Sequence, residues 1–463
     1  MKARSISFVV KDKLCTMCGT CAGICPLNAI DMIFDHKRGV YEPDVIEDRC
    51  TDCGICVDCC IGHKVAIGEY RSNATREVQI DRHFGRFVSI LRANSTNKEI
   101  RNRGASGGVV TSILTYLFSK ELIDAAVVTR MDQEDPVKVV PYIAYNADAL
   151  IPSQKSKYSP TPLNTILREC LSDRFDGKRI AYVGLPCHIE GLRSAQQRSP
   201  ELRKRITISI SLFCHHMPTR VATEYLMYLN KIRLEDLQAI DYRGSGKPGK
   251  LRFVLKDGSE IFIPHLHWSY WGYTFLKFFI LRRCWLCYDK CGEMADISVG
   301  DNWQNYRVEM EGAATLLTRS RGADQLMHDI AGHSYINIHD MSLGEFVNDQ
   351  DLEKTYELSP RLDLCKHLGI KVPLYGGITS SSKPFTRLKA AIPALQVLIS
   401  EHSASLSNLD IVIRSFYLCH KTKTGVGLFM LFIVRKLLFM LFVLRKLIAV
   451  STRILFRRNN FTV

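Results

Sequence analysis

The sequence predicts a chain in three parts: a small α+β unit rich in cysteine, a larger α/β body and a basic amphipathic helix near the C-terminal end. Three observations lead to this prediction. Nine of the 17 cysteines fall within residues 15–60, in two similar sets. Across the middle of the chain, strand-like apolar runs alternate with glycine-containing turns and helix-like runs, as in α/β folds. Close to the C-terminal end, an apolar segment containing Arg-Lys occurs twice in succession.

The composition limits the classes of function. The net charge is +15, but residues 381–463 alone hold 13 Lys and Arg against Glu401 and Asp410, a net +11. The rest of the 463-residue chain is therefore nearly neutral for its size, which argues against a nucleic-acid-binding surface. No secretion signal is visible, because the apolar run at 6–10 is short and charged residues follow it at once. We therefore expect a cytoplasmic chain whose clustered cysteines bind metal or serve redox chemistry.

The front of the chain repeats the spacing C-x2-C-x2-C-x3-C. The first set is Cys15, Cys18, Cys21 and Cys25, and the second is Cys50, Cys53, Cys56 and Cys60. This arrangement resembles bacterial-type ferredoxins with two [4Fe–4S] clusters, in which the fourth cysteine of each set ligates the cluster of the other set. The resemblance implies an α+β ferredoxin-like domain over residues 1–70. Its first cluster would use Cys15, Cys18, Cys21 and Cys60, and its second would use Cys50, Cys53, Cys56 and Cys25.

Two features of this front leave alternatives open. Zinc also binds cysteine, although its sites favour two separated pairs of ligands over two successive triads. Ile61 stands where ferredoxins usually have proline, which affects the direction of the chain more than ligation. Cys59 is an additional cysteine and could compete with Cys60 for one corner of a cluster.

The body begins with a glycine-rich turn at residues 104–108, followed by a helix-like run at 109–118 and a strand-like run at 125–128. Backbone N–H groups at the start of a helix form a suitable cradle for phosphate. The alternative is a tight turn that lets the helix pack closely.

Further along the body, cysteines follow two strand-like runs. Cys187 and Cys214 lie at the carboxyl ends of these runs, where ligands bind in open α/β sheets. Together with Cys284 and Cys287 they supply four thiolates, enough for a third cluster, with zinc as the alternative. The adjacent Arg282 and Arg283 would offset its negative charge, and Cys291 could be an alternative ligand.

Several motifs occur in a particular order: GASGGVV at 104–110, SKY at 156–158, GLPC at 184–187, LFCH at 212–215, and the C-x2-C of 284–287 followed by ADISVGD. Over roughly residues 10–345 this ordered set resembles the beta-subunit family of coenzyme F420 hydrogenases and dehydrogenases. The resemblance implies a flavin-binding α/β body, usually with FAD, that passes electrons between iron–sulfur clusters and a two-electron acceptor.

The resemblance also implies roles for single residues. Gly104, Ser106, Gly107 and Gly108 would form the flavin phosphate loop, and Lys157 and Tyr158 would lie at the flavin or substrate face. Cys187, Cys214, Cys284 and Cys287 would ligate the cluster on the flavin side. His215 and His216 are candidate proton donors, because histidine titrates near neutral pH, and Lys157 is a further candidate catalytic residue. A histidine after a strand is, however, more often structural.

Five segments are expected in all. They are the ferredoxin-type domain at 1–70, an N-terminal body domain at 71–165, a C-terminal body domain at 166–345, a linker and helical region at 346–420, and an amphipathic helix at 421–463.

In the helix expected at 421–463, LFMLFIVRKL is followed by LFMLFVLRKL, with basic residues along one face and apolar residues opposite. This predicts a helix that lies on an anionic membrane surface through residues 428–458. Docking on a protein partner and a tilted membrane span are the alternatives.

The sequence therefore predicts an oxidoreductase in the cytoplasm, peripheral to the inner face of the membrane, with two [4Fe–4S] clusters, FAD and a candidate third cluster. Its expected partners are a ferredoxin or another redox protein, and a small-molecule hydride donor or acceptor. The alternative is an electron-relay subunit of a larger complex that turns over no substrate of its own.

Overall fold

The computed structural model describes residues 5–72, 78–243, 249–264, 279–304, 312–350, 352, 362–363, 365–366 and 369–376. The amphipathic helix expected at 421–463 lies outside these residues and stays a prediction. Of the helices that the structure describes, none combines the length and the apolar character needed to cross a membrane.

The cysteine-rich front folds as two similar halves. Its elements are α1 (Ser7–Lys11), α2 (Thr20–Gly23), β1 (Ile30–Asp35), β2 (Val40–Val45), α3 (Ile55–Asp58), β3 (Lys64–Val65) and α4 (Ile67–Ser72). Gly19 and Gly54, with φ of 83° and 78°, precede α2 and α3. Glycine adopts this left-handed conformation at little cost, so the repeated Cys-Gly sequence produces the same single helical turn twice. We call residues 5–72 the front unit.

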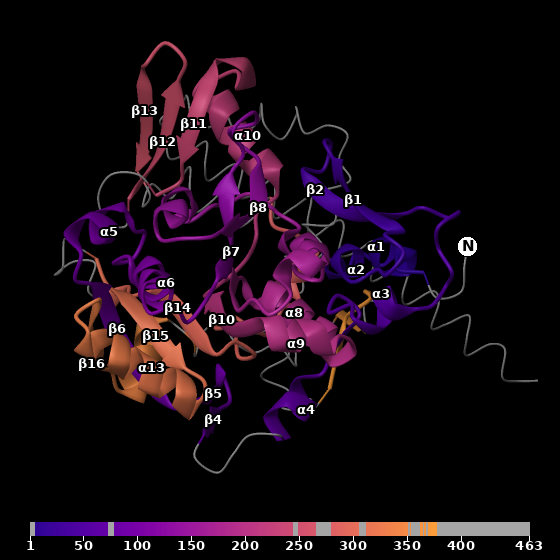
Figure 1. The fold of residues 1–463 in the computed structure, drawn as a ribbon. Helices are drawn as coiled ribbons and strands as arrows, with labels where there is room; N and C mark the ends of the chain where they lie inside the picture. Colours follow the sequence, from indigo (N-terminus) through magenta and orange to yellow (C-terminus); the bar gives the residue numbers. More distant parts are fainter. Residues whose placement is uncertain are drawn as a thin grey trace, which may run out of the picture. The chain divides into compact units, whose positions relative to one another are not determined.

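The body is built on one eight-stranded mixed sheet with the order β16-β6-β15-β14-β10-β9-β7-β8 (Figure 1). Its strands are β6 (Ser89–Ser95), β7 (Ala125–Met131), β8 (Val139–Ala144), β9 (Ile180–Gly184), β10 (Ile206–Leu212), β14 (Ile297–Asp301), β15 (Ala314–Thr318) and β16 (Ile336–Asp340). The consecutive strands β14, β10, β9 and β7 are parallel, and antiparallel strands extend the sheet on both sides. The predicted α/β body is thus confirmed as a mixed sheet with helices, and strands from both sides of residue 165 pair within it.

Helices cover both faces of this sheet. The described helices of the body are α5 (Lys98–Arg103), α6 (Val109–Ser119), α7 (Leu167–Cys170), α8 (Pro186–Arg198), α9 (Pro200–Arg205), α10 (Arg220–Leu229), α12 (Arg282–Trp285), α13 (Arg321–Gly332) and α14 (Leu343–Asp349). Ala126 and Val128 of β7 share an apolar cluster with α6 and α13, whereas Ala125 and Val127 share another with α8, α9 and the front unit. Because side chains alternate along a strand, the front unit packs on the face opposite α6 and α13.

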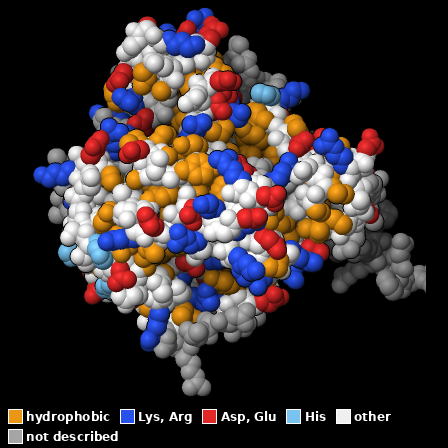
Figure 2. Space-filling model, viewed as in Figure 1, with side chains coloured by type: hydrophobic (Ala, Val, Ile, Leu, Met, Phe, Trp, Pro, Cys, Tyr) orange, Lys and Arg blue, Asp and Glu red, His pale blue; other side chains and the backbone are white. Residues whose placement is uncertain are grey.

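Smaller sheets complete the described fold. β11 (Leu237–Asp241), β12 (Lys250–Leu255) and β13 (Glu260–Pro264) form an antiparallel sheet that shares an apolar core with α10. β4 (Gln79–Asp81) pairs with β5 (Gly85–Phe87), and β17 (Leu374–Tyr375) pairs with β3 of the front unit. On the face shown in Figure 2, Lys and Arg are interspersed with Asp and Glu, in agreement with the nearly neutral charge expected outside the C-terminal region.

Candidate functional site

Cys60 lies beside the first cysteine set, not beside the set to which it belongs in the sequence. Burial raises the pKa of Cys15, and the thiols of Cys60 and Cys18 add to the rise. Burial also raises the pKa of Cys21, with contributions from Cys18, Cys15 and Cys60. These mutual interactions show that Cys15, Cys18, Cys21 and Cys60, the four residues expected at the first cluster, lie close to one another.

Cys25 is correspondingly placed with the second set. Burial raises the pKa of Cys56 to about 11, and the thiols of Cys53 and Cys25 act on it as well. Cys53 is exposed and Cys50 is half-buried. Cys56 also contributes to the raised pKa of Cys21, so the two groups of cysteines are neighbours.

The additional cysteine of the front unit points elsewhere. The Cys59 thiol is 1% exposed and donates to the carbonyl oxygen of Ser194 on α8 at 3.7 Å. This contact directs Cys59 toward the body.

Within the described ranges, no group of three or more His, Cys, Asp or Glu side chains is arranged to hold a metal ion. A cubane is bound through four separate irons, so its cysteines stand farther apart than the ligands of one ion.

Four cysteines of the body line one cavity. Cys187 lies in the first turn of α8, directly after β9, and Cys214 follows β10. Because β9 and β10 are adjacent and parallel, their carboxyl ends meet at one edge of the sheet. Cys284 and Cys287 reach the same cavity from α12 and the segment after it. Segments far apart in the sequence thus converge on one place, which we call the cysteine cavity.

The cysteine cavity also borders the front unit. Thr16, Met17 and Ile61 line it, and each is the neighbour in sequence of a cysteine grouped at the first site. Burial raises the pKa of Cys187, and the thiols of Cys214 and Cys18 add to the rise. The cysteine cavity and the first cysteine group are therefore adjacent.

Three buried polar atoms of the cysteine cavity have no hydrogen-bond partner in the described part of the protein. They are Thr161 Oγ1, Glu190 Oε1 and Arg283 Nε. Such atoms are uncommon and costly in a folded protein, so they indicate a polar group that fills the cavity. The four thiols fit a [4Fe–4S] cluster, and a four-cysteine zinc site would use the same donors.

Cys291, the alternative ligand, is fully buried, but it is not among the residues that line this cavity. Its carbonyl oxygen accepts a hydrogen bond from Arg319.

The two candidate histidines differ in surroundings. His215 lines the cysteine cavity, so its ring can approach a group bound there. The His216 ring packs against Trp285, with 4.4 Å between ring centroids. The packing of His216 favours a structural role, whereas a role of His215 in proton transfer stays a prediction.

The glycine-rich turn lies at the start of α6, as predicted. Gly107 and Gly108 have φ of 80° and 73°, and a Cβ at Gly108 would lie 2.6 Å from the carbonyl oxygen of Ile100. Close packing alone therefore requires glycine here, and Ser106 is half-buried. The turn is held by Arg243, which donates to the carbonyl oxygen of Ala105 at 3.2 Å and forms an ion pair with Asp301.

Lys157 and Tyr158 lie after the 3-10 turn Asp148–Ser153. The Lys157 ammonium donates to the carbonyl oxygens of Ser153, Gln154 and Lys155, at 2.8, 3.0 and 3.3 Å. It therefore holds its own turn. The Tyr158 ring packs edge-on against Tyr242, with 5.7 Å between centroids.

The buried Lys157 should make the free energy of unfolding depend on pH. Burial lowers its pKa to about 7, Asp241 opposes this shift and Lys155 adds to it. Since the pKa is higher in the unfolded chain, unfolding takes up a proton between about pH 7 and pH 10, and stability from this group rises with pH there. The rise is at most about 1.4 kcal/mol per pH unit. Denaturant unfolding at several pH values should show that K157M removes it, with exposed Lys98→Met as the matched control. Parallel profiles for wild type and K157M would contradict this expectation.

Two important residues were missed by sequence reasoning. Asn164 is fully buried between the front unit and α8, and it belongs to no motif, since its partners lie far away in the sequence. Glu190 was also missed, although an acidic residue three positions after Cys187, on the buried side of a helix, could have drawn attention.

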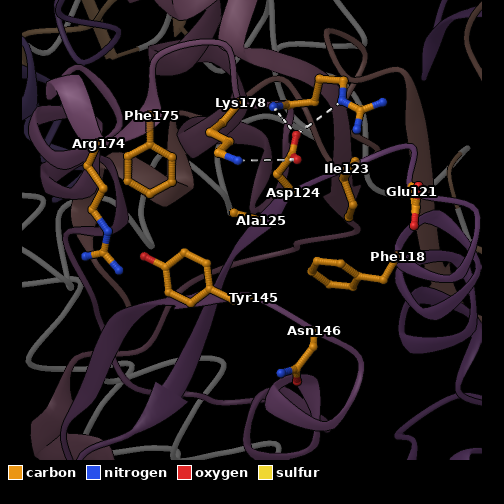
Figure 3. A pocket seen from close by; sticks show the side chains of 11 residues that line it. Phe118, Glu121, Ile123, Asp124, Ala125, Tyr145, Asn146, Arg174, Phe175 and Lys178 are labelled. Carbon is orange, nitrogen blue, oxygen red and sulfur yellow. Dashed lines mark hydrogen bonds and ion pairs between the residues drawn. The ribbon is translucent and has the colours of Figure 1, made fainter.

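A second cavity, of about 560 Å³, lies at the opposite edge of the sheet, near the amino ends of β7 and β9 (Figure 3). Asp124 accepts hydrogen bonds from Arg179 and lies 3.9 Å from Lys178 Nζ. None of the residues that line this cavity is a cysteine or a histidine. Its lining therefore offers no thiolate or imidazole ligand to a metal or cluster.

Three segments of the chain match known families. Residues 90–168 match the family described as coenzyme F420 hydrogenase/dehydrogenase, beta subunit N-term, and residues 177–343 match the corresponding C terminus. Residues 8–31 match the 4Fe-4S binding domain.

Curated relatives and a solved structure extend this likeness. The chain is 26% identical over 364 residues to the coenzyme F420-dependent sulfite reductase of Methanocaldococcus jannaschii, covering 76% of this chain and 49% of that protein. It is 25% identical to one of the subunits of the F(420)H(2) dehydrogenase from Methanosarcina mazei, covering 70% of this chain and 87% of the relative. The chain thus spans about half the length of the first relative and most of the second. The fold is similar to a chain of the F420-reducing [NiFe] hydrogenase complex from Methanosarcina barkeri, with a TM-score of 0.50, 18% identity and coverage of 65% of this chain and 99% of that one.

Proposed function

Because the chain belongs to the beta-subunit family of coenzyme F420 hydrogenases and dehydrogenases, we propose that it is an iron–sulfur flavoprotein that passes electrons between ferredoxin-type clusters and a two-electron substrate. The family places the chain among the subunits of iron–sulfur oxidoreductases. The flavin, the exchange of a hydride and the substrate class belong to the proposal.

One observation supports this function above the others. The cysteine cavity brings together Cys187, Cys214, Cys284 and Cys287, and it borders the first cysteine group of the front unit. A relay that moves single electrons needs neighbouring redox groups buried from water. The arrangement of these cysteines offers two such groups side by side.

We assign the cysteines as follows. Cys15, Cys18, Cys21 and Cys60 would hold cluster one, Cys50, Cys53, Cys56 and Cys25 would hold cluster two, and Cys187, Cys214, Cys284 and Cys287 would hold a third cluster. The mutual electrostatic interactions within the first and third sets, and those that join Cys25, Cys53 and Cys56, support this grouping.

For the flavin, taken as FAD, we propose the glycine-rich turn as the phosphate site, with Gly104, Ser106, Gly107 and Gly108. Arg243 holds this turn through the carbonyl oxygen of Ala105, and its charge is paired with that of Asp301. Lys157 and Tyr158 would border the flavin or the substrate, and His215, which lines the cysteine cavity, would be the proton donor.

When bound, the clusters supply single-electron transfer and the flavin supplies hydride exchange with a small molecule, of the deazaflavin type or another. The chain positions these groups. Cys53 is exposed, so a redox partner protein, a ferredoxin or a subunit of a larger complex, can approach the front unit there. Peripheral binding to an anionic membrane through residues 428–458 is a separate part of the proposal.

The alternative is an electron-relay subunit without a substrate of its own. Anaerobic purification with iron, sulfide, zinc and flavin measured together separates the two functions. The proposed enzyme should contain about twelve irons per chain and one flavin, whereas clusters without flavin would favour the relay. Zinc in place of iron would contradict both.

Removal of a ligand should test the third cluster. C187A and C284A are each expected to retain about eight irons per chain, because the two clusters of the front unit remain. C291A is the matched control and should keep about twelve, since Cys291 does not line the cavity. Iron analysis and electron paramagnetic resonance (EPR) of the reduced protein would measure this. A full complement of iron in C187A would contradict the assignment.

A further inference from the structure

Arg283 is a buried cation between two groups of cysteines. Its side chain is 2% exposed and lies in α12, directly before Cys284. Its Nη2 donates to the carbonyl oxygen of Ile61 at 3.2 Å, and Ile61 directly follows Cys60. The same side chain lines the cysteine cavity. One guanidinium group therefore touches the front unit and faces the ligands of the body.

The charge of Arg283 lies beside both groups. Arg283 directly precedes Cys284 in α12, and its guanidinium contacts Ile61, the residue after Cys60. Since arginine stays protonated in proteins, this positive charge is permanent.

Arg283 also has an unused donor. Its Nε is buried and has no hydrogen-bond partner among the described residues, although the side chain lines the cavity. A buried N–H without an acceptor is unfavourable. A thiolate or sulfide sulfur of a bound cluster is an acceptor of the right kind at this position. Glu190 lines the same cavity, where burial raises its pKa to about 8 and Arg283 opposes this rise.

We propose that Arg283 is a positioning residue that holds the Cys187–Cys214–Cys284–Cys287 cluster against the front unit and raises its reduction potential, through its fixed charge and an Nε–H hydrogen bond to a cluster sulfur. Reduction adds one electron to a group that is already negative, so a nearby cation and a hydrogen bond to sulfur both favour the reduced form. No proton is exchanged, because Arg283 remains protonated before and after. This inference rests on the proposed function.

Redox titration followed by EPR tests this role in the full chain, purified without oxygen. The signal that is absent from C187A identifies the cluster of the cysteine cavity. In R283M the equilibrium between its oxidised and reduced forms should shift about tenfold toward the oxidised form, which lowers the midpoint potential by about 59 mV for one electron. R283K should fall between R283M and the wild type. R282M, which removes the same charge from a half-buried neighbour, is the matched control and should shift the potential less.

An unshifted midpoint in R283M with a full complement of iron would overturn the proposal. If R283M fails to assemble the cluster, R283Q takes its place, because glutamine is neutral but can still donate to the carbonyl oxygen of Ile61. An unshifted midpoint in R283Q with a full complement of iron would then overturn the proposal. Pulsed EPR of wild-type protein labelled with ¹⁵N-arginine gives a measurement without substitution. It should show nitrogen coupled to the reduced cluster of the cavity, and no coupling would overturn the hydrogen bond. A wild-type chain with only about eight irons would instead refute the third cluster of the proposed function.

Discussion

Gly23→Ala is expected to lower the free energy of unfolding by about 3 kcal/mol or more. Gly23 is the last residue of α2, between Cys21 and Cys25 of the front unit. A Cβ at this position would lie 1.9 Å from the carbonyl oxygen of Asn164 and 3.2 Å from Cβ of Leu167. Backbone atoms of the body cannot move aside as a flexible side chain would, so α2 must shift away from the body.

The midpoint of thermal unfolding and the iron content of anaerobic protein would measure this effect. Gly322→Ala in α13 is the matched control, because a Cβ there meets nothing within 4 Å and alanine favours a helix by up to about 1 kcal/mol. We expect the control to keep or raise the midpoint and Gly23→Ala to lower it and to reduce cluster content. Equal midpoints for the two variants would show that the front unit is not packed on the body as described.

Asn164→Ala is the second substitution with a large expected effect, a loss of about 3 kcal/mol or more, because it breaks several buried hydrogen bonds at once. Asn164 Nδ2 donates to Thr20 Oγ1 at 2.8 Å and to the carbonyl oxygen of His188 at 2.9 Å. Its Oδ1 accepts from the buried hydroxyl of Tyr182. Its backbone N–H donates to the carbonyl oxygen of Cys18 at 2.8 Å, and this bond remains in the alanine variant. Each partner that is left unsatisfied in the interior costs about 1–3 kcal/mol.

Denaturant unfolding of the holo chain, with limited proteolysis to locate the loosened region, would measure this loss. Tyr182→Phe removes a single hydrogen bond of the group and should lose less than Asn164→Ala. Asn102→Ala, at an exposed position of α5, is the matched control and should change stability little. If Asn164→Ala resembled Asn102→Ala, the hydrogen bonds of Asn164 would not hold the front unit to the body.

Features set by short stretches of sequence were predicted well. Gly19 and Gly54 each follow a cysteine and start a single helical turn, so the repeat in the sequence is a repeat in the structure. The strand and helix after the glycine-rich turn were also predicted, and α6 and β7 confirm them. These elements depend on neighbouring residues, whose pattern can be read directly.

Features set by distant partners could not be predicted. The sequence shows Arg282 and Arg283 as equivalent cations, and only the packing of α12 buries one and leaves the other half-buried. Asn164 has no surrounding pattern, because its partners come from the front unit, β9 and α8. The glycine-rich turn remains ambiguous for a different reason. The glycines that close packing requires at Gly104 and Gly108 are the same glycines that a phosphate site would need.

The order of the strands affects the synthesis of this protein on the ribosome. β6 is completed at residue 95, but both of its neighbours in the sheet, β15 and β16, begin only at residues 314 and 336. At typical translation speeds the nascent chain spends roughly 10–45 s between these points. For most of that time this largely buried strand has neither of its hydrogen-bonding partners, and β14, whose edge later receives β15, has not yet been made. Chaperones that shield nascent strands thus have a defined interval in which to act on this chain. This interval ends only when translation has passed residue 340, the last residue of β16.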